Sequence, residues 1–218
     1  MEDLNNTLHS VLGFAAAAAA LVALVSAKGS RWHRRAGWLF VAGMAVSAVT
    51  AWLFMIARPL PLAMVSATVT LYSLGMALLA VSPHWRSARV WAWMLFCVLL
   101  VVMLEMLAVS ANLYRTGSNF FAAPLAMFAI FAVFAVRDWR YLRATAIGRI
   151  DRLQRHALFM ALAVSQMIMA PTIILAPDLN VPVPVIVFGS LMLVPVIYFG
   201  FAPAARRAAT RDPAADVA

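Results

Sequence analysis

Residues 90–111 read VWAWMLFCVLLVVMLEMLAVSA, an apolar run in which Glu105 is the one ionisable side chain. The hydrocarbon core of a bilayer is about 30 Å thick, and roughly 20 helical residues are needed to cross it. This run therefore predicts a transmembrane helix. Six more apolar runs of similar length precede or follow it, so the sequence predicts an all-α polytopic bundle of seven transmembrane helices within residues 1–203. The predicted helices are Leu8–Ala27, Ala36–Ala57, Leu60–Val81, Val90–Ala111, Phe120–Val136, Ala157–Ala176 and Val181–Ala202.

The composition excludes an ordinary water-soluble domain. Hydrophobic residues make up 65% of the 218 residues, charged residues make up 11%, and the mean hydropathy is +0.92. Soluble domains carry about 25% charged residues. So few polar groups cannot cover the surface of a domain in water, whereas lipid faces apolar side chains at no cost. Cys97 is the only cysteine, which excludes an internal disulfide, and we expect it to pack inertly in an apolar run.

The basic residues alternate between the two ends of the predicted helices, which predicts the orientation. Of the 17 Lys and Arg residues, all but Arg58 and Arg115 follow the first, third, fifth and seventh runs. Because cytoplasmic loops are rich in Lys and Arg, the N-terminus is predicted outside and the C-terminus inside a bacterial inner membrane. Residues 204–218 are predicted to form a disordered cytoplasmic tail. The net charge of +9 is explained by topology, and nucleic acid is not expected as a partner.

Residues 137–156 carry six arginines between the fifth and sixth runs. Their apolar residues recur at helical spacing, which predicts an amphipathic helix lying on the membrane surface. The arginines of this helix would face anionic lipid headgroups. The apolar residues concerned are Trp139, Leu142, Ala146, Ile150 and Leu153.

Three of the four histidines share one setting. His33, His84 and His156 each stand at the cytoplasmic start of an outward-running helix, the second, fourth and sixth. A helix N-terminus disfavours the imidazolium, and neutral imidazole is the form that binds haem iron or a metal ion. The alternative is that these side chains contact lipid headgroups in the interfacial region. Haem b is the candidate cofactor, and the identity of any metal is left open.

Glu105 is the only ionisable residue deep inside a predicted span. A charged side chain at the centre of a bilayer costs about 2.5–3.5 kcal/mol on insertion scales, so Glu105 is expected to face the bundle interior. Asn112 lies on the same helix face, and Gln166 of the sixth helix is a candidate partner. Other candidate partners for Glu105 are Thr68, Thr70 and Tyr72 of the third helix. Glu105 therefore has two alternative roles, as part of a proton pathway or as a partner in a structural hydrogen bond.

The stretch from Lys28 to Trp38 reads KGSRWHRRAGW and is followed by an apolar helix containing Met44. It resembles the Lys-Gly-x-x-x-His-Arg-x-x-Gly element of a bacterial family of uncharacterised multi-pass membrane proteins. His156 with Met160 is similar to a later element of that family. The resemblance spans most of the chain, and it implies a multi-pass topology and a role for His33 and His156.

Several activities lack the residues they need. The only lysine, Lys28, lies outside the last helix, which excludes a retinal Schiff base there. No phosphate-binding loop, nucleophile elbow or metalloprotease motif occurs, and no catalytic motif is recognised. Three functions remain. The favoured one is an accessory or assembly subunit, binding a membrane protein or a second copy, with Gly37, Gly43 and Ser47 as a small-residue packing face. The alternatives are a haem or redox protein and a proton-coupled carrier built around Glu105.

Overall fold

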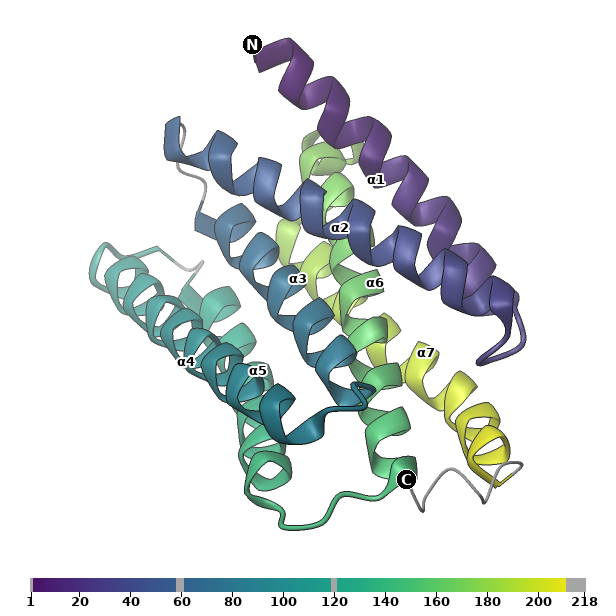
Figure 1. Cartoon of the computed structure of the whole chain (residues 1–218). Coiled ribbons are helices and arrows are strands. Elements are labelled where there is room, and N and C mark those ends of the chain that lie inside the picture. The colour runs from purple at the N-terminus through teal and green to yellow at the C-terminus, as the bar shows by residue number, and fades with distance from the viewer. Residues whose placement is uncertain (1, 58–60, 119–120, 211–218) are drawn as a thin grey trace.

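The computed structural model describes residues 2–57, 61–118 and 121–210, and within these ranges the chain forms seven helices and no strand (Figure 1). The all-α prediction is therefore confirmed. The helices are α1 (Glu2–Val25), α2 (Arg31–Ala57), α3 (Pro61–Ala80), α4 (Trp85–Arg115), α5 (Ala122–Arg143), α6 (Arg149–Leu179) and α7 (Val183–Thr210).

Among the residues that the structure describes, four helices are long and apolar enough to cross a membrane. The qualifying stretches in α2, α3, α4 and α5 are Arg31–Met55, Ala63–Ala80, Ser87–Arg115 and Ala122–Arg143. Shorter apolar stretches occur in α1 and α7, at His9–Val25 and Pro184–Gly200. Length and composition of these helices are those of a membrane protein.

The first five helices pack one after another, α1 on α2, α2 on α3, α3 on α4 and α4 on α5. Helix α6 does not continue this series: it lies beside α3 in Figure 1 and packs against both α3 and α7. The connections 26–30, 81–84 and 144–148 lie at the same end of the bundle as the end of α7, and we call this the basic end (Figure 1). The alternation of basic residues in the sequence likewise predicts that these connections share one end of the bundle.

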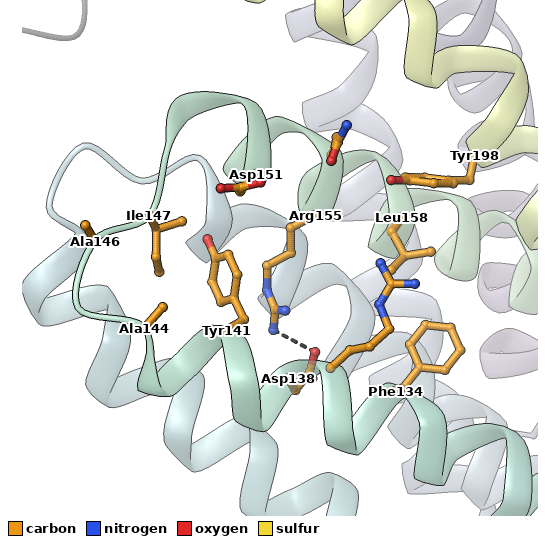
Figure 2. A pocket seen from close by; sticks show the side chains of 12 residues that line it. Phe134, Asp138, Tyr141, Ala144, Ala146, Ile147, Asp151, Arg155, Leu158 and Tyr198 are labelled. Atoms are coloured by element: carbon orange, nitrogen blue, oxygen red, sulfur yellow. Dashed lines mark ion pairs between the residues drawn. The ribbon is translucent and has the colours of Figure 1, made fainter.

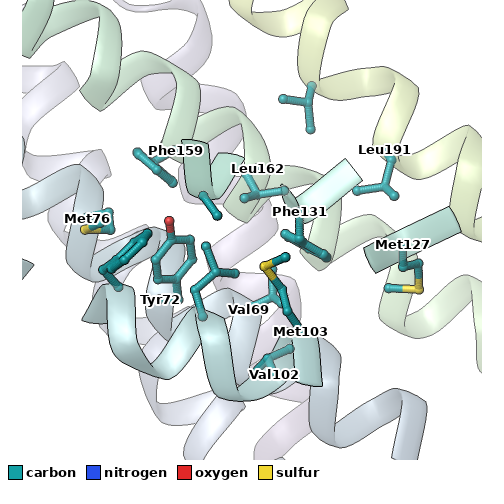
Figure 3. Packing of buried hydrophobic residues seen from close by; sticks show 14 of the residues in the cluster. Val69, Tyr72, Met76, Val102, Met103, Met127, Phe131, Phe159, Leu162 and Leu191 are labelled. Carbon is teal, nitrogen blue, oxygen red and sulfur yellow. The ribbon is translucent and has the colours of Figure 1, made fainter. Parts of the chain in front are cut away.

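The main core lies between α3, α4, α5, α6 and α7 (Figure 3). Tyr72 of α3, Phe131 of α5 and Phe159 of α6 are at most 1% exposed. Tyr72 and Phe159 meet edge to face, with ring centroids 5.5 Å apart. Aromatic pairs prefer this arrangement because the positive edge of one ring meets the negative face of the other.

Small residues join α1 to α2. A Cβ atom added to Gly43 would lie 3.0 Å from the Cβ of Ala16, so the two helices touch at this point. Ser47 is buried on the same face, and its carbonyl oxygen accepts a hydrogen bond from Nδ1 of His9 at 3.1 Å. The packing face predicted at Gly43 and Ser47 therefore exists, but α1 of the same chain covers it.

Two predictions about the chain between and after the helices are wrong. Residues 137–156 are not one surface helix, because α5 continues to Arg143 and α6 begins at Arg149. Leu142 is fully buried in the core, while Trp139 packs against α4 with its ring centroid 5.4 Å from that of Trp93. The predicted disordered tail is also helical as far as Thr210, and residues 211–218 lie outside the described ranges.

Candidate functional site: the basic end of the bundle

A buried ion pair joins α5 to α6. Asp138 and Arg155 are 1% and 8% exposed, and Nη2 of Arg155 lies 2.9 Å from Oδ1 of Asp138 (Figure 2). The second carboxylate oxygen accepts a hydrogen bond from the hydroxyl of Tyr72 on α3. Both oxygens of Asp138 are therefore satisfied inside the bundle, as a buried carboxylate requires.

Aromatic rings enclose the guanidinium of Arg155. Its central carbon lies 4.0 Å from the ring centroid of Tyr141 and 4.9 Å from that of Phe159. A ring face attracts a cation, and a desolvated cation–π contact is worth about 2 kcal/mol. The planar guanidinium can stack on a ring and donate to a carboxylate at once, which a lysine ammonium cannot do.

Basic side chains cap the ends of α1, α3 and α5 at the basic end. The last carbonyls of a helix have no intrahelical partner, and cations there also meet the negative end of the helix dipole. Lys28 donates to the carbonyls of Ala23 and Leu24 of α1 at 3.0 and 2.7 Å. Burial lowers the pKa of Lys28. The end of α3 receives hydrogen bonds from Arg152 to Ala80 and Ser82, and the end of α5 receives one from Arg89 to Leu142.

His33 and His156 belong to the same capping pattern. Nδ1 of His33 lies 3.0 Å from the carbonyl oxygen of Ala23, and Nδ1 of His156 lies 3.0 Å from that of Ala77. A carbonyl oxygen only accepts, so Nδ1 carries the proton in both rings. Burial lowers the pKa of His156, the hydrogen bond to the carbonyl of Ala77 raises it, and nearby His33 lowers it. In the neutral ring with this tautomer, Nε2 offers a lone pair, and His33 lies near enough to His156 to influence its pKa.

His84 does not join these two histidines. It is exposed at the residue before α4, and its backbone N–H donates to the hydroxyl of Ser82. Among the residues described, no group of three or more His, Cys, Asp or Glu side chains is arranged to hold a metal ion. A site built on all three predicted histidines therefore has no geometric support.

Glu105 lies on the outer surface of α4, so the prediction that it faces the bundle interior is wrong. The core stripe of α4 includes Phe96, Leu99, Met103 and Met106. Glu105 follows Met103 by two residues, and two residues turn a helix by about 200°, to its opposite side. A carrier that conducts protons through the bundle at Glu105 is therefore not supported.

The polar residues expected around Glu105 have other partners. Gln166 is buried on α6, and its side-chain oxygen accepts a hydrogen bond from Ser66 at 2.9 Å. Thr68 accepts a hydrogen bond from Trp52, and Thr70 donates to the carbonyl of Ser66. Asn112 is exposed on α4. Glu105, Asn112 and Gln166 therefore do not form one site.

The ion pair of Asp138 and Arg155 was not predicted from the sequence. Asp138 is an isolated acidic residue in the Arg-rich stretch Val136 to Arg143, and it precedes the fully buried Leu142 by one helical turn. That i, i+4 spacing is the one available signal that Asp138 faces inward. Its partner is 17 positions away along the chain, across the connection that brings α6 beside α5.

The ion pair lines one of two neighbouring cavities. One, of about 200 Å³, lies at the basic end between α5, α6 and α7 and is lined by charged, aromatic and aliphatic side chains (Figure 2). The other, of about 230 Å³, lies beside it between the same three helices and is mainly apolar.

Comparison of the chain with family models, with curated proteins and with solved structures gave no match.

Proposed function

We propose that this chain is an assembly-type subunit of a bacterial inner membrane, which forms complexes through the outer face of α4. The observation that carries the proposal is the exposure of Glu105 on that face. Around it stand Val101 and Leu104, 55% and 65% exposed, and the exposed Cys97. An ionisable residue facing outward in an apolar helix marks a surface that another helix covers.

The proposed topology has seven spans, with the N-terminus outside and the basic end in the cytoplasm. It is supported by the four long apolar helices, by the shorter apolar stretches of α1 and α7, and by the basic residues at one end of the bundle. Exposed arginines there would meet anionic headgroups. The 31 residues of α4 are about 46 Å long, so Glu105 lies about 8 Å from the helix midpoint, within the hydrocarbon core.

The proposed partner on this face is a second copy of the chain. Copies inserted in the same direction are related by a two-fold axis along the membrane normal, so residues at equal depth meet. A protonated carboxyl has one donor and an acceptor, so two Glu105 side chains are complementary to each other. Each hydrogen bond between helices in a membrane contributes about 0.6–2 kcal/mol. The pair would remove the cost of leaving each Glu105 against lipid.

Cys97 makes this proposal directly testable. It lies eight residues before Glu105 and about 80° around the helix from it, and both side chains are exposed, so an α4–α4 contact brings two copies of Cys97 near each other. Mild oxidation, or a short bis-maleimide, should convert the chain in native membranes into a covalent dimer. A disulfide needs Cα atoms within about 7 Å. The Glu105→Leu variant should give a several-fold lower yield of dimer.

The matched control is the Cys97→Ser, Val196→Cys double variant, because Val196 is 68% exposed on α7. This control should stay monomeric under the same conditions. A chain that gives no dimer through Cys97, or an equal yield through Val196, contradicts self-association through α4. A dimer whose yield is unchanged by Glu105→Leu contradicts the role given to Glu105.

A second candidate function is supported by the two capped histidines. Histidines that bind a metal ion donate their other ring N–H to a carbonyl or carboxylate, as His33 and His156 do. In its neutral form each ring then offers Nε2, the nitrogen that ligates haem iron. If the pair holds haem b, the protein purified from haem-replete cells shows a Soret absorption band, which His156→Ala abolishes and His84→Ala retains. A spectrum without that band after haem addition rejects the haem function.

A further inference from the structure

The two cavities between α5, α6 and α7 form one groove with a polar part and an apolar part. They share Phe134, Arg137, Leu158 and Tyr198 in their walls. The polar part also has Asp151 and Gln154, at the start of α6. The apolar part extends in the other direction along Ile130, Leu191 and Val194. The groove exists because α5 packs mainly against α4, whereas α6 packs mainly against α3 and α7.

Charge in the polar part is arranged in a definite order. Asp138 and Arg155 neutralise each other within the wall. Arg137 and Asp151 are the remaining charged wall residues, and both are exposed. Arg137 stands where the polar and apolar parts meet, and Asp151 belongs to the polar part alone. Successive parts of a molecule lying in the groove would thus contact apolar side chains, then a cation and then an anion.

We infer that this groove binds a phospholipid with a phosphoethanolamine headgroup. The order along such a lipid is acyl chains, phosphate and primary ammonium, which matches apolar wall, Arg137 and Asp151. Arg137 would donate to the phosphate, and the three N–H groups of the ammonium would reach Asp151 and the side-chain oxygen of Gln154. The polar cavity has a volume of about 200 Å³, which suits a headgroup and not a whole lipid.

The test uses the full chain in detergent, titrated with dioleoyl lipids while bound lipid is counted by native mass spectrometry. Phosphatidylethanolamine should bind about three- to fivefold more tightly than phosphatidylglycerol, which has no ammonium group. Asp151→Asn should abolish this preference by weakening phosphatidylethanolamine alone. Arg137→Gln should weaken both lipids. Free phosphoethanolamine should bind far more weakly than the lipid, because it has no chains to fill the apolar part.

Matched controls are Arg140→Gln and Asp178→Asn, which change exposed charges on α5 and α6 outside the groove. Neither should alter the preference. Equal affinity for the two lipids in the wild-type chain overturns the inference. So does an equal loss of affinity in Arg140→Gln and Arg137→Gln. Free phosphoethanolamine that binds as tightly as the lipid would show a soluble-headgroup site and would also overturn it.

Discussion

Replacing Arg155 with alanine is expected to lower the free energy of unfolding by about 3–5 kcal/mol. The substitution leaves the carboxylate of Asp138, which is 1% exposed, with Tyr72 as its remaining partner. A charge that has been taken out of water and loses its counter-ion keeps its desolvation cost without compensation. The substitution also removes the stacking of the guanidinium on Tyr141. Unfolding of the detergent-solubilised chain by added SDS, followed by circular dichroism, measures the effect.

Arg140→Ala is the matched control for this experiment, because Arg140 is exposed on the same end of α5. It should change the free energy of unfolding by less than about 0.5 kcal/mol. The Asp138→Leu, Arg155→Met double variant removes both charges and should recover most of the loss. If Arg155→Ala and Arg140→Ala destabilise the chain equally, the buried pair does not stabilise the basic end.

Replacing Phe159 with alanine is expected to destabilise the chain by about 2–4 kcal/mol. Phe159 is fully buried and contacts the rings of Tyr72 and Phe134 and the guanidinium of Arg155. In water-soluble cores Phe→Ala costs about 3–5 kcal/mol. The cost is lower here because an unfolded chain in detergent also keeps Phe159 in hydrocarbon, which leaves lost packing as the main contribution.

The same unfolding experiment measures Phe159→Ala. Its control is Phe199→Ala, because Phe199 is 70% exposed on α7 and faces detergent in the folded state as well. That control should stay within about 0.5 kcal/mol of wild type. Equal losses in the two variants would mean that the centre of the bundle is not tightly packed around Phe159.

The helices could be predicted from the sequence because an apolar run long enough for a bilayer is a local property. The predicted run Leu60–Val81 and the helix Pro61–Ala80 agree within one residue at each end. At the basic end the predicted helices were too short. Helix α5 continues past Val136 to Arg143, because arginine is a good helix former and its charge limits only the apolar run.

Which side of each helix points into the bundle could not be predicted in the same way. In water, polar residues mark the outer face of a helix and apolar residues the inner face. In lipid both faces are apolar, so the periodicity that would have placed Glu105 outside and Asp138 inside is largely absent. The assumption that an ionisable residue must face inward therefore led to the wrong prediction for Glu105. The actual buried carboxylate is Asp138, at the basic end.

The sequence by itself determined an all-helical chain, the extent of its apolar helices and the gathering of basic residues at alternate connections. Each follows from local composition, because a helix satisfies its own backbone groups and its length must match its solvent. Only the tertiary structure decided that Arg155 pairs with Asp138, that His156 caps α3, and that Glu105 faces outward. These depend on the rotation of each helix about its axis, which packing against neighbouring helices sets and which an apolar sequence in an apolar solvent leaves open.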